Sequence, residues 1–308
     1  MNAAQRLSRI IMICRDPDRL AGFYEAAFGF ALTGEGSISE PALSELIGVK
    51  GATERIVTLR LGEQEIGLAG ISPPGDPYPR SVTGSNPLFQ HCAIVISDMP
   101  AAYARLSVQA GWNRISADGP QLLPASSGGV TAYKFRDPEG HPLELLAFAA
   151  AAVPARWRKF SASACLGIDH SAISIADTGR SVKFYERLGF HCIGRSLNCG
   201  PAQDKLDSIP KALVEVTALA PRKCSTPHVE LLCYRGRRTR YTALPDTNDA
   251  AATRLVLAVD NHEILQALCA QCSDDLLSGP VRFENGALRA MVRDPDGHIL
   301  CLEVSPTA

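Results

Sequence analysis

The chain has 308 residues, 46% of them hydrophobic and 20% charged, and its formal net charge at pH 7 is −1. This composition predicts a globular protein long enough for two domains, without a basic field that would attract nucleic acid or an acidic membrane. No apolar run reaches the length of a membrane span and the first residues lack a signal-peptide core. We therefore expect a cytoplasmic protein with neither nucleic-acid nor membrane partners.

Ten cysteines are scattered along the chain, and several of them fall inside apolar segments that read as strands. This distribution favours buried free thiols in a reducing compartment over a disulfide framework. Cys269 and Cys272 have a spacing found in zinc sites, but they fall in a helical pattern with no second Cys or His pair nearby. We do not expect zinc there.

The first predicted unit opens with an apolar strand over residues 7–14, and a helix follows from Pro17. Asp16 is suited to cap this helix, Pro17 to its first turn, and Gly29 to its end. Strand-like segments then follow near residues 31–34, 55–61 and 65–69. The predicted order of this unit is βαβββ.

The second predicted unit follows a segment rich in Pro, Gly and Ser, residues 72–86. It has a strand at 91–98, a helix at 99–110, and strands near 129–136 and 142–148. The last two strands are joined by Asp-Pro-Glu-Gly, in which Pro presets one φ and Gly closes the turn. Glu144 then lies in the middle of an apolar strand, where a carboxylate is costly unless it is paired.

The same pattern appears twice more, in units that begin near residues 167 and 252. The first strand of each unit ends in Asp, at positions about 80 residues apart: Asp16, Asp98, Asp177 and Asp260. Such internal repetition is typical of a fold built from copies of one supersecondary unit. The sequence therefore predicts four βαβββ units.

Two further motifs recur with these units. The first helix carries Phe23-Tyr24-Glu25 and ends in Phe28-Gly29-Phe30, and the third unit repeats it as Phe184-Tyr185-Glu186 and Leu188-Gly189-Phe190. The turn at residues 137–141 returns at residues 294–298 as Asp-Pro-Asp-Gly-His. Together with the four units, these motifs resemble the vicinal oxygen chelate superfamily, which includes glyoxalase I, methylmalonyl-CoA epimerase, extradiol dioxygenases and fosfomycin or bleomycin resistance proteins.

The resemblance implies an α+β fold with four βαβββ units in two tandem domains, paired into cupped mixed sheets. We expect the first domain at residues 1–150, with units at 7–70 and 88–148. A linker would follow at 151–165. The second domain would occupy 166–308, with units at 167–234 and 252–305. His141 and His298 belong to the turn motif in both copies, so we do not expect them to be ligands.

The resemblance also implies where a metal ion would bind, because ligands in this superfamily come from the first and last strands of each unit. Counting back seven residues from each strand-ending Asp gives Arg9, His91, His170 and Thr253. The matching positions in the last strands are Gly67, Glu144, Glu230 and Cys301. Units two and three therefore each keep a His and a Glu, whereas units one and four have neither.

This pattern favours pairing of units two and three across the two halves of the chain, as in the domain-swapped glyoxalases. One complete site would then contain His91, Glu144, His170 and Glu230 as metal ligands, and the other would be vestigial. Two neutral imidazoles and two carboxylates balance one divalent ion, which could be Ni, Zn, Mn, Co or Fe. Pairing of consecutive units is the alternative, and it would leave two half-empty sites.

The resemblance implies a metal-dependent, glyoxalase-like lyase or isomerase that acts on a small substrate with adjacent oxygens through a metal-stabilised enediolate. Glu144 and Glu230 would be the catalytic carboxylates. Leu231-Leu232-Cys233-Tyr234 after Glu230 differs from the Thr-His-Asn type of segment that helps hold glutathione in glyoxalase I, so glutathione is not expected. Alternatives are an extradiol-type dioxygenase with Fe(II) and a non-enzymatic small-molecule binding or resistance protein. We expect a monomer or homodimer.

Overall fold

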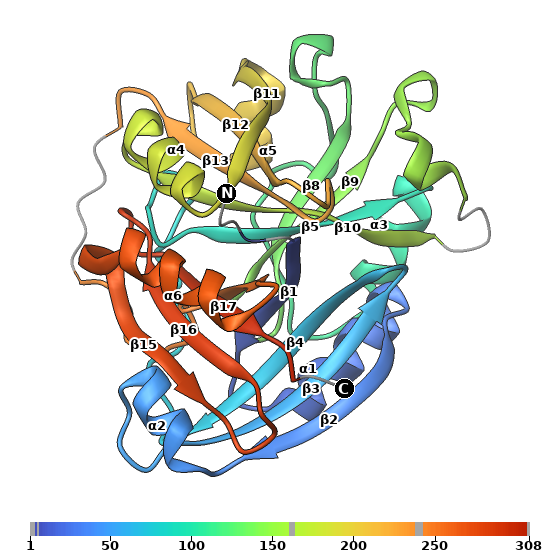
Figure 1. Cartoon of the computed structure of the whole chain (residues 1–308). Helices are drawn as coiled ribbons and strands as arrows, with labels where there is room; N and C mark the ends of the chain where they lie inside the picture. The colour runs from blue at the N-terminus through green and yellow to red at the C-terminus, as the bar shows by residue number, and fades with distance from the viewer. Residues whose placement is uncertain (1–3, 5, 160–163, 238–242, 307–308) are drawn as a thin grey trace.

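The computed structural model describes residue 4 and residues 6–159, 164–237 and 243–306. Two cupped mixed sheets dominate the molecule, one in the lower and one in the upper half of the view in Figure 1, and helices cover their outer faces. This is the predicted α+β architecture. Part of the predicted linker, residues 160–163, lies outside the described residues.

The first sheet, called sheet A here, contains eight strands from units one and four. Its order is β15 (Leu276–Arg282), β16 (Leu288–Arg293), β17 (Ile299–Val304), β14 (Arg254–Ala258), β1 (Arg6–Ile13), β4 (Gln64–Ser72), β3 (Thr53–Leu61) and β2 (Ala31–Ile38).

The second sheet, sheet B, contains strands of units two and three. Its order is β11 (Phe190–Cys199), β12 (Leu213–Pro221), β13 (His228–Tyr234), β10 (Cys165–Ile175), β5 (Gln90–Ile96), β9 (Pro142–Ala147), β8 (Thr131–Arg136) and β6 (Asn113–Arg114), with β7 (Gln121–Leu122) also paired to β8.

At the centre of each sheet, the first strands of two units from different halves of the chain pair antiparallel. In sheet B these are β5 and β10, with His91 opposite Ala172 and Ala93 opposite His170. In sheet A they are β1 and β14, with Ile11 opposite Arg254. The pairing across halves that the retained His and Glu residues favoured is therefore the observed one.

The six α-helices of the described residues fall into four long ones and two short ones. The long helices follow the first strands and are α1 (Pro17–Phe28), α3 (Met99–Ser107), α4 (Thr178–Arg187) and α6 (His262–Gln271). The short ones, which the sequence analysis did not predict, are α2 (Pro41–Ile47) and α5 (Pro201–Asp207). Short 3₁₀ segments are η1 (Ala125–Ser127), η2 (Ala150–Ala152), η3 (Ala155–Lys159) and η4 (Ser273–Asp275). No helix among the described residues is long and apolar enough to cross a membrane.

Side-chain caps fix where the long helices begin. Asp16, Asp98 and Asp177 each accept a hydrogen bond from the backbone N–H three residues later, as expected for N-cap residues. In unit four the cap is Asn261, which accepts from Ile264 N at 2.9 Å, and not the strand-ending Asp260. The repeat is therefore offset by one residue in this unit.

The recurring motifs join consecutive units. The Tyr24 hydroxyl donates to Asp137 Oδ2 at 3.1 Å, and His141 contacts the same carboxylate through Nδ1 and the carbonyl of Ile13 through Nε2, both at 2.9 Å. Burial favours the neutral imidazole, but Asp137 opposes it and raises the pKa of His141. Units three and four repeat the first and the last of these contacts, from the Tyr185 hydroxyl to Asp294 and from His298 Nε2 to the carbonyl of Ser174. The two turn histidines thus have structural roles, as predicted.

Strand alternation divides each sheet between two environments. On β5, Cys92, Ile94 and Ile96 point into the main apolar core, which unites the outer faces of both sheets with the long helices. His91 points to the opposite, concave face of sheet B and lines a cavity. The core therefore positions the backbone, and the concave faces are left to carry chemistry.

Candidate metal centre

A cavity of about 310 Å³ occupies the concave face of sheet B. Its floor contains one polar side chain from each of the four central strands: His91 on β5, His170 on β10, Glu144 on β9 and Glu230 on β13. Parallel pairing places Ala93 next to Glu144 and Ala172 next to Glu230, so each glutamate lies two residues along from the histidine of its own unit. The structure thus brings together all four residues predicted from the sequence.

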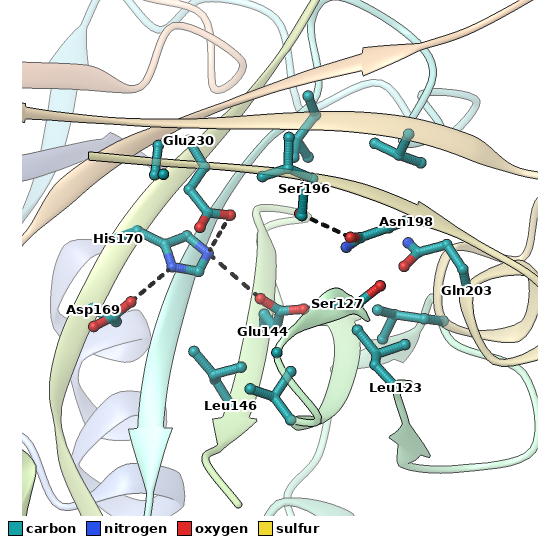
Figure 2. A pocket seen from close by; sticks show the side chains of 18 of the residues that line it. Leu123, Ser127, Glu144, Leu146, Asp169, His170, Ser196, Asn198, Gln203 and Glu230 are labelled. Atoms are coloured by element: carbon teal, nitrogen blue, oxygen red, sulfur yellow. Dashed lines mark hydrogen bonds and ion pairs between the residues drawn. The ribbon is translucent and has the colours of Figure 1, made fainter. Parts of the chain in front are cut away.

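His170 lies at the centre of this group, between the two carboxylates (Figure 2). Its Nε2 is 3.6 Å from Glu144 Oε2 and 3.5 Å from Glu230 Oε2, and His91 Nε2 is 3.3 Å from the same Glu144 oxygen. One ligand atom from each of His91, Glu144 and His170 lies within 4.8 Å of the others. These contacts are longer than ordinary hydrogen bonds, which favour about 2.7–3.2 Å.

The spacing and the unmet hydrogen-bonding capacity fit a shared divalent ion. Ligands that each lie about 2.1 Å from an ion are roughly 3.0 Å apart in octahedral and roughly 3.4 Å apart in tetrahedral geometry. Among the described residues, His91 Nδ1 and Nε2 and His170 Nε2 are buried without a hydrogen-bond partner. Buried polar atoms rarely remain unpaired, so this donor set accommodates a cation well.

The electrostatics of the two histidines differ. Burial lowers the pKa of His91, and the nearby Lys134 ammonium adds to this effect. Burial also disfavours the charged form of His170, but Glu230, Asp169 and Glu144 outweigh it and raise the pKa of His170. Burial would raise the pKa of Glu144, yet the two imidazoles hold it well below its usual range. The carboxylate is therefore ionised, as a metal ligand must be.

The two glutamates are not equivalent. The Glu144 side chain is 7% exposed and contacts both histidines, whereas the Glu230 side chain is 23% exposed and contacts His170 and His228. His228 lies two residues before Glu230, and its Nε2 is 3.5 Å from Glu230 Oε1. Glu144 is thus fixed on two sides, while Glu230 has more room toward the cavity.

A second layer of contacts orients His170. Its Nδ1 donates to Asp169 Oδ2 at 3.2 Å, and the other oxygen of Asp169 accepts from the Trp157 indole, also at 3.2 Å. Trp157 lies in η3, within the segment that joins the two halves of the chain, and it is buried. A carboxylate behind a histidine fixes the tautomer and the ring orientation that present Nε2 to a metal. Asp169 and Trp157 were not predicted, because the repeated motif carries no signal for them.

A buried polar network on one wall of the cavity was also not predicted. Lys134, on β8 directly opposite Glu144, places Nζ 2.8 Å from Asp207 Oδ1. Asp207 Oδ2 accepts from Gln203 Nε2 at 2.6 Å and from the Tyr234 hydroxyl at 3.0 Å. A signal existed, since Lys134 precedes the turn Asp137 by three residues and thus lies opposite the ligand strand.

Sheet A contains the residues expected for a vestigial site, with one correction. Arg9, Gly67 and Cys301 occupy the places of His170, Glu230 and Glu144 in the register of their strands. The prediction of Thr253 is wrong. Val256 pairs with Cys301, so the residue two positions earlier, Arg254, corresponds to His91. The cause is the helix cap at Asn261, because counting back seven residues from the true cap leads to Arg254.

The sequence profile of the Glyoxalase/Bleomycin resistance protein/Dioxygenase superfamily matches residues 6–145 and 167–302. The chain belongs to this superfamily. The vicinal oxygen chelate resemblance found in the motifs is thereby confirmed. No curated protein sequence matches the chain.

Solved structures of this superfamily have the same fold over nearly the whole chain. Glyoxalase I from Zea mays superimposes with a TM-score of 0.64 at 16% identity, covering 98% of this chain and 92% of that one. A protein from Bacillus subtilis that is named as a candidate dioxygenase gives a TM-score of 0.60 at 14% identity, covering 99% and 87%. At such identities the similarity concerns the fold alone.

Proposed function

We propose that the chain is a metal-dependent lyase or isomerase that moves a proton on a small substrate with two adjacent oxygens. The observation that carries the proposal is the set of two buried histidines and two glutamates, His91, His170, Glu144 and Glu230, on the floor of one cavity. Their unpaired nitrogens and their contacts of 3.3–3.6 Å suit one shared divalent ion.

A divalent ion held there would act as a Lewis acid and stabilise negative charge that develops on substrate oxygen. The four side chains would hold it from one side and leave the cavity side open to the substrate. Asp169 would keep His170 oriented, and Glu144, which contacts both histidines, would remain in place.

Glu230 is the residue best placed to move the proton. It is less buried than Glu144 and contacts only one of the two candidate ligand histidines, while its second carboxylate oxygen lies beside His228. A general base must reach the proton that it abstracts and return it later, which requires some freedom of the carboxylate. We therefore assign Glu230 as the base and Glu144 as the fixed ligand.

The second candidate is an extradiol-type dioxygenase. It is favoured by one observation, that one group of ligand atoms within 4.8 Å of one another contains two histidines and one carboxylate, His91, His170 and Glu144, the set typical of non-haem Fe(II) oxygenases. Glu230 weighs against it, because a fourth ligand 3.5 Å from His170 Nε2 would occupy a position that oxygen requires.

Metal analysis of the purified protein tests the shared premise, and one divalent ion per chain is the expected result. Incubation with 2-hydroxyaldehydes and 2-hydroxyketones in D₂O should then place deuterium on the carbon next to the carbonyl, as read by NMR. Replacing Glu230 with Gln should abolish this exchange while most of the metal is retained. Oxygen uptake with Fe(II) and catechols, without such exchange, would support the dioxygenase instead.

A chain that retains the metal yet turns over no compound in either assay would favour the third class, a protein that binds or sequesters a small molecule. Pairing of consecutive units was the arrangement expected for that class, and the sheets have the other pairing. A purified protein without stoichiometric metal, even after reconstitution, would contradict both enzyme proposals together.

A further inference from the structure

One wall of the cavity in sheet B carries a cluster of polar side chains beside the candidate ligands. Lys134, Gln203 and Tyr234 line the cavity, Asp207 lies behind them, and each of the four is almost wholly buried. Lys134 comes from unit two, whereas the other three come from unit three, so the cluster lies across the junction of the two halves. The proposed proton transfer gives this cluster no role.

The concave face of sheet A provides a direct internal comparison. The positions of Lys134, Gln203, Asp207 and Tyr234 in their units are occupied in sheet A by apolar residues: Met291, Leu43, Ile47 and Ile71. These four belong to one buried apolar cluster. The fold therefore does not need polar groups at these places. Burying a charge pair where apolar side chains would pack is at best weakly stabilising, which points to a role in binding.

Hydrogen-bond counting shows which member of the cluster has capacity left. Asp207 accepts from three donors: Lys134 Nζ, Gln203 Nε2 and the Tyr234 hydroxyl. An ammonium has three N–H groups, and among the described residues the Lys134 ammonium has one acceptor within hydrogen-bond distance, Asp207. The Lys134 side chain is 6% exposed and lines the cavity. Its remaining donors are therefore available to a bound molecule.

The position of Lys134 relates it to the candidate metal. It faces Glu144 across an antiparallel pair, where opposite Cβ atoms lie about 5 Å apart. Asp207 Oδ1 lies 2.8 Å from Lys134 Nζ, so the ammonium has its own carboxylate partner and carries its charge. Two glutamates neutralise a divalent ion, and Asp207 neutralises Lys134. An ammonium is thus fixed one side chain away from the place where two adjacent oxygens would bind.

We propose that the Lys134 ammonium binds a carboxylate oxygen of the substrate, which makes the substrate a small α-hydroxy or α-oxo acid. This inference rests on the proposed function. In such an acid, the α-oxygen and one carboxylate oxygen form the adjacent pair that faces the ligands, and the second carboxylate oxygen accepts from Lys134. Asp207, held by Gln203 and Tyr234, is the positioning residue that keeps the ammonium at this wall.

The test uses two probes of similar size, bound to the protein reconstituted with Zn²⁺ or Co²⁺. Oxalate presents two adjacent oxygens and further carboxylate oxygens, whereas acetohydroxamate presents two adjacent oxygens and a methyl group. Replacing Lys134 with Met, the residue found at this position in sheet A, should weaken oxalate binding by about tenfold or more, the loss of one charge-assisted hydrogen bond. Acetohydroxamate binding should change less than about twofold, and Lys134→Arg should restore part of the oxalate affinity.

The double variant Lys134→Met with Asp207→Ile reproduces the sheet A pair and removes the unpaired carboxylate left by the single change. It should show the same selective loss, with metal stoichiometry unchanged. Equal effects on both probes, no effect on oxalate, or no oxalate binding to the metal-loaded wild type would overturn the role of Lys134 and leave the metal site standing. Failure of the wild type to retain metal would overturn the proposed function and this inference together.

Discussion

The concave faces of sheets B and A, here called the open cup and the filled cup, share one plan of four central strands, but the places of the two candidate ligand glutamates are open only in sheet B. At corresponding places, sheet B has His170 and His91 where sheet A has Arg9 and Arg254, respectively. Histidine can be neutral and coordinate a cation, whereas arginine stays protonated and has no acceptor atom. Exchanging imidazole for guanidinium is therefore sufficient to exclude a cation from the same backbone frame.

In sheet A the glutamates pair with arginines. Glu303 Oε1 is 2.8 Å from Arg9 Nη2 and Glu303 Oε2 is 2.8 Å from Arg289 Nε. Glu54 Oε2 is 3.0 Å from Arg254 Nη1. Glu303 is two residues beyond Cys301, the position that corresponds to the ligand Glu144. Both glutamates of this cup are thus paired with arginines, whereas the candidate ligands of the other cup have no such cationic side-chain partner among the described residues.

Apolar side chains occupy the rest of the filled cup. A Cβ at Gly67 would lie 3.0 Å from the Ile56 tip and 3.2 Å from Ile11, so the space of a ligand glutamate has been taken. Helix α2 contributes Leu43, Leu46 and Ile47 to the same cluster, whereas α5 contributes Gln203 and Leu206 to the cavity of sheet B. In this chain, the concave face that contains the candidate ligands is thus the one whose short helix and central strands both carry polar side chains.

The largest effect is expected from breaking the buried ion pair of the filled cup. Replacing Glu54 with Gln leaves Arg254 buried without a counter-charge and should lower the free energy of unfolding by about 3–5 kcal/mol. Chemical denaturation measures this change, and metal content per folded chain should remain as in the wild type.

The matched control for this pair is the double replacement Glu54→Leu with Arg254→Met, which removes both charges. It should cost far less than the single change, because well-packed apolar residues replace a buried pair at little cost. A loss below about 1 kcal/mol for Glu54→Gln would show that the pair is solvated and that the cup is not closed in the way described.

The next largest effect concerns the two corresponding ligand-strand positions, Glu144 and Cys301. Glu144→Ala should reduce metal affinity by more than about a hundredfold, since loss of an outer-layer partner alone typically costs 10–100-fold. Cys301→Ala should leave metal affinity unchanged. Competition with a chromophoric chelator measures both, and equal behaviour of the two variants would contradict the assignment of the open cup as the metal site.

A smaller effect is expected from the groups behind His170, which the filled cup lacks. Ser8, rather than an Asp, precedes Arg9, the counterpart of His170, there. Asp169→Asn should weaken metal binding by about 10–100-fold because His170 loses its orienting carboxylate. Trp157→Phe, which removes one hydrogen bond to Asp169, should weaken it only about fivefold. A larger effect of Trp157→Phe than of Asp169→Asn would reverse this order of roles.

Much of the fold was predictable because short-range sequence signals mark each of the repeated units. Asp caps, the Tyr-bearing helix and the Asp-Pro-x-Gly-His turns act over a few residues, and they located four units and, in units two and three, the four side chains that the structure brings together in one cavity. The retention of His and Glu in those two units also predicted the cross-half pairing, since a cation requires its charges in one place.

The remaining features depend on contacts that no local pattern specifies. Lys134 and Asp207 are 73 residues apart, and their 2.8 Å contact exists only because α5 of unit three lies over β8 of unit two. Thr253 was a wrong choice because Asp260 resembles a cap, while the side chain that binds the helix N-terminus belongs to Asn261. Local rules gave the register to within one residue, and one residue reverses the face of a strand.

The smallest and most local difference between the cups is the reactivity of Cys301, which occupies the position of Glu144. Burial raises the pKa of this thiol to about 11, against a partial opposing effect of Arg289. At pH 8 the thiolate, which is the reactive form, should therefore be a fraction on the order of 0.001 of the total.

Iodoacetamide at pH 8 should label the exposed Cys192 and Cys199 in the folded protein and leave Cys301 unmodified, as read by mass spectrometry of its peptides. Labelling of Cys301 should appear only after unfolding, because the apolar side chains packed around it shield its thiol from solvent. If Cys301 instead reacted in the folded state as fast as Cys199, the cup of sheet A would be open to small molecules, and its arginines would have to be considered as a second binding site.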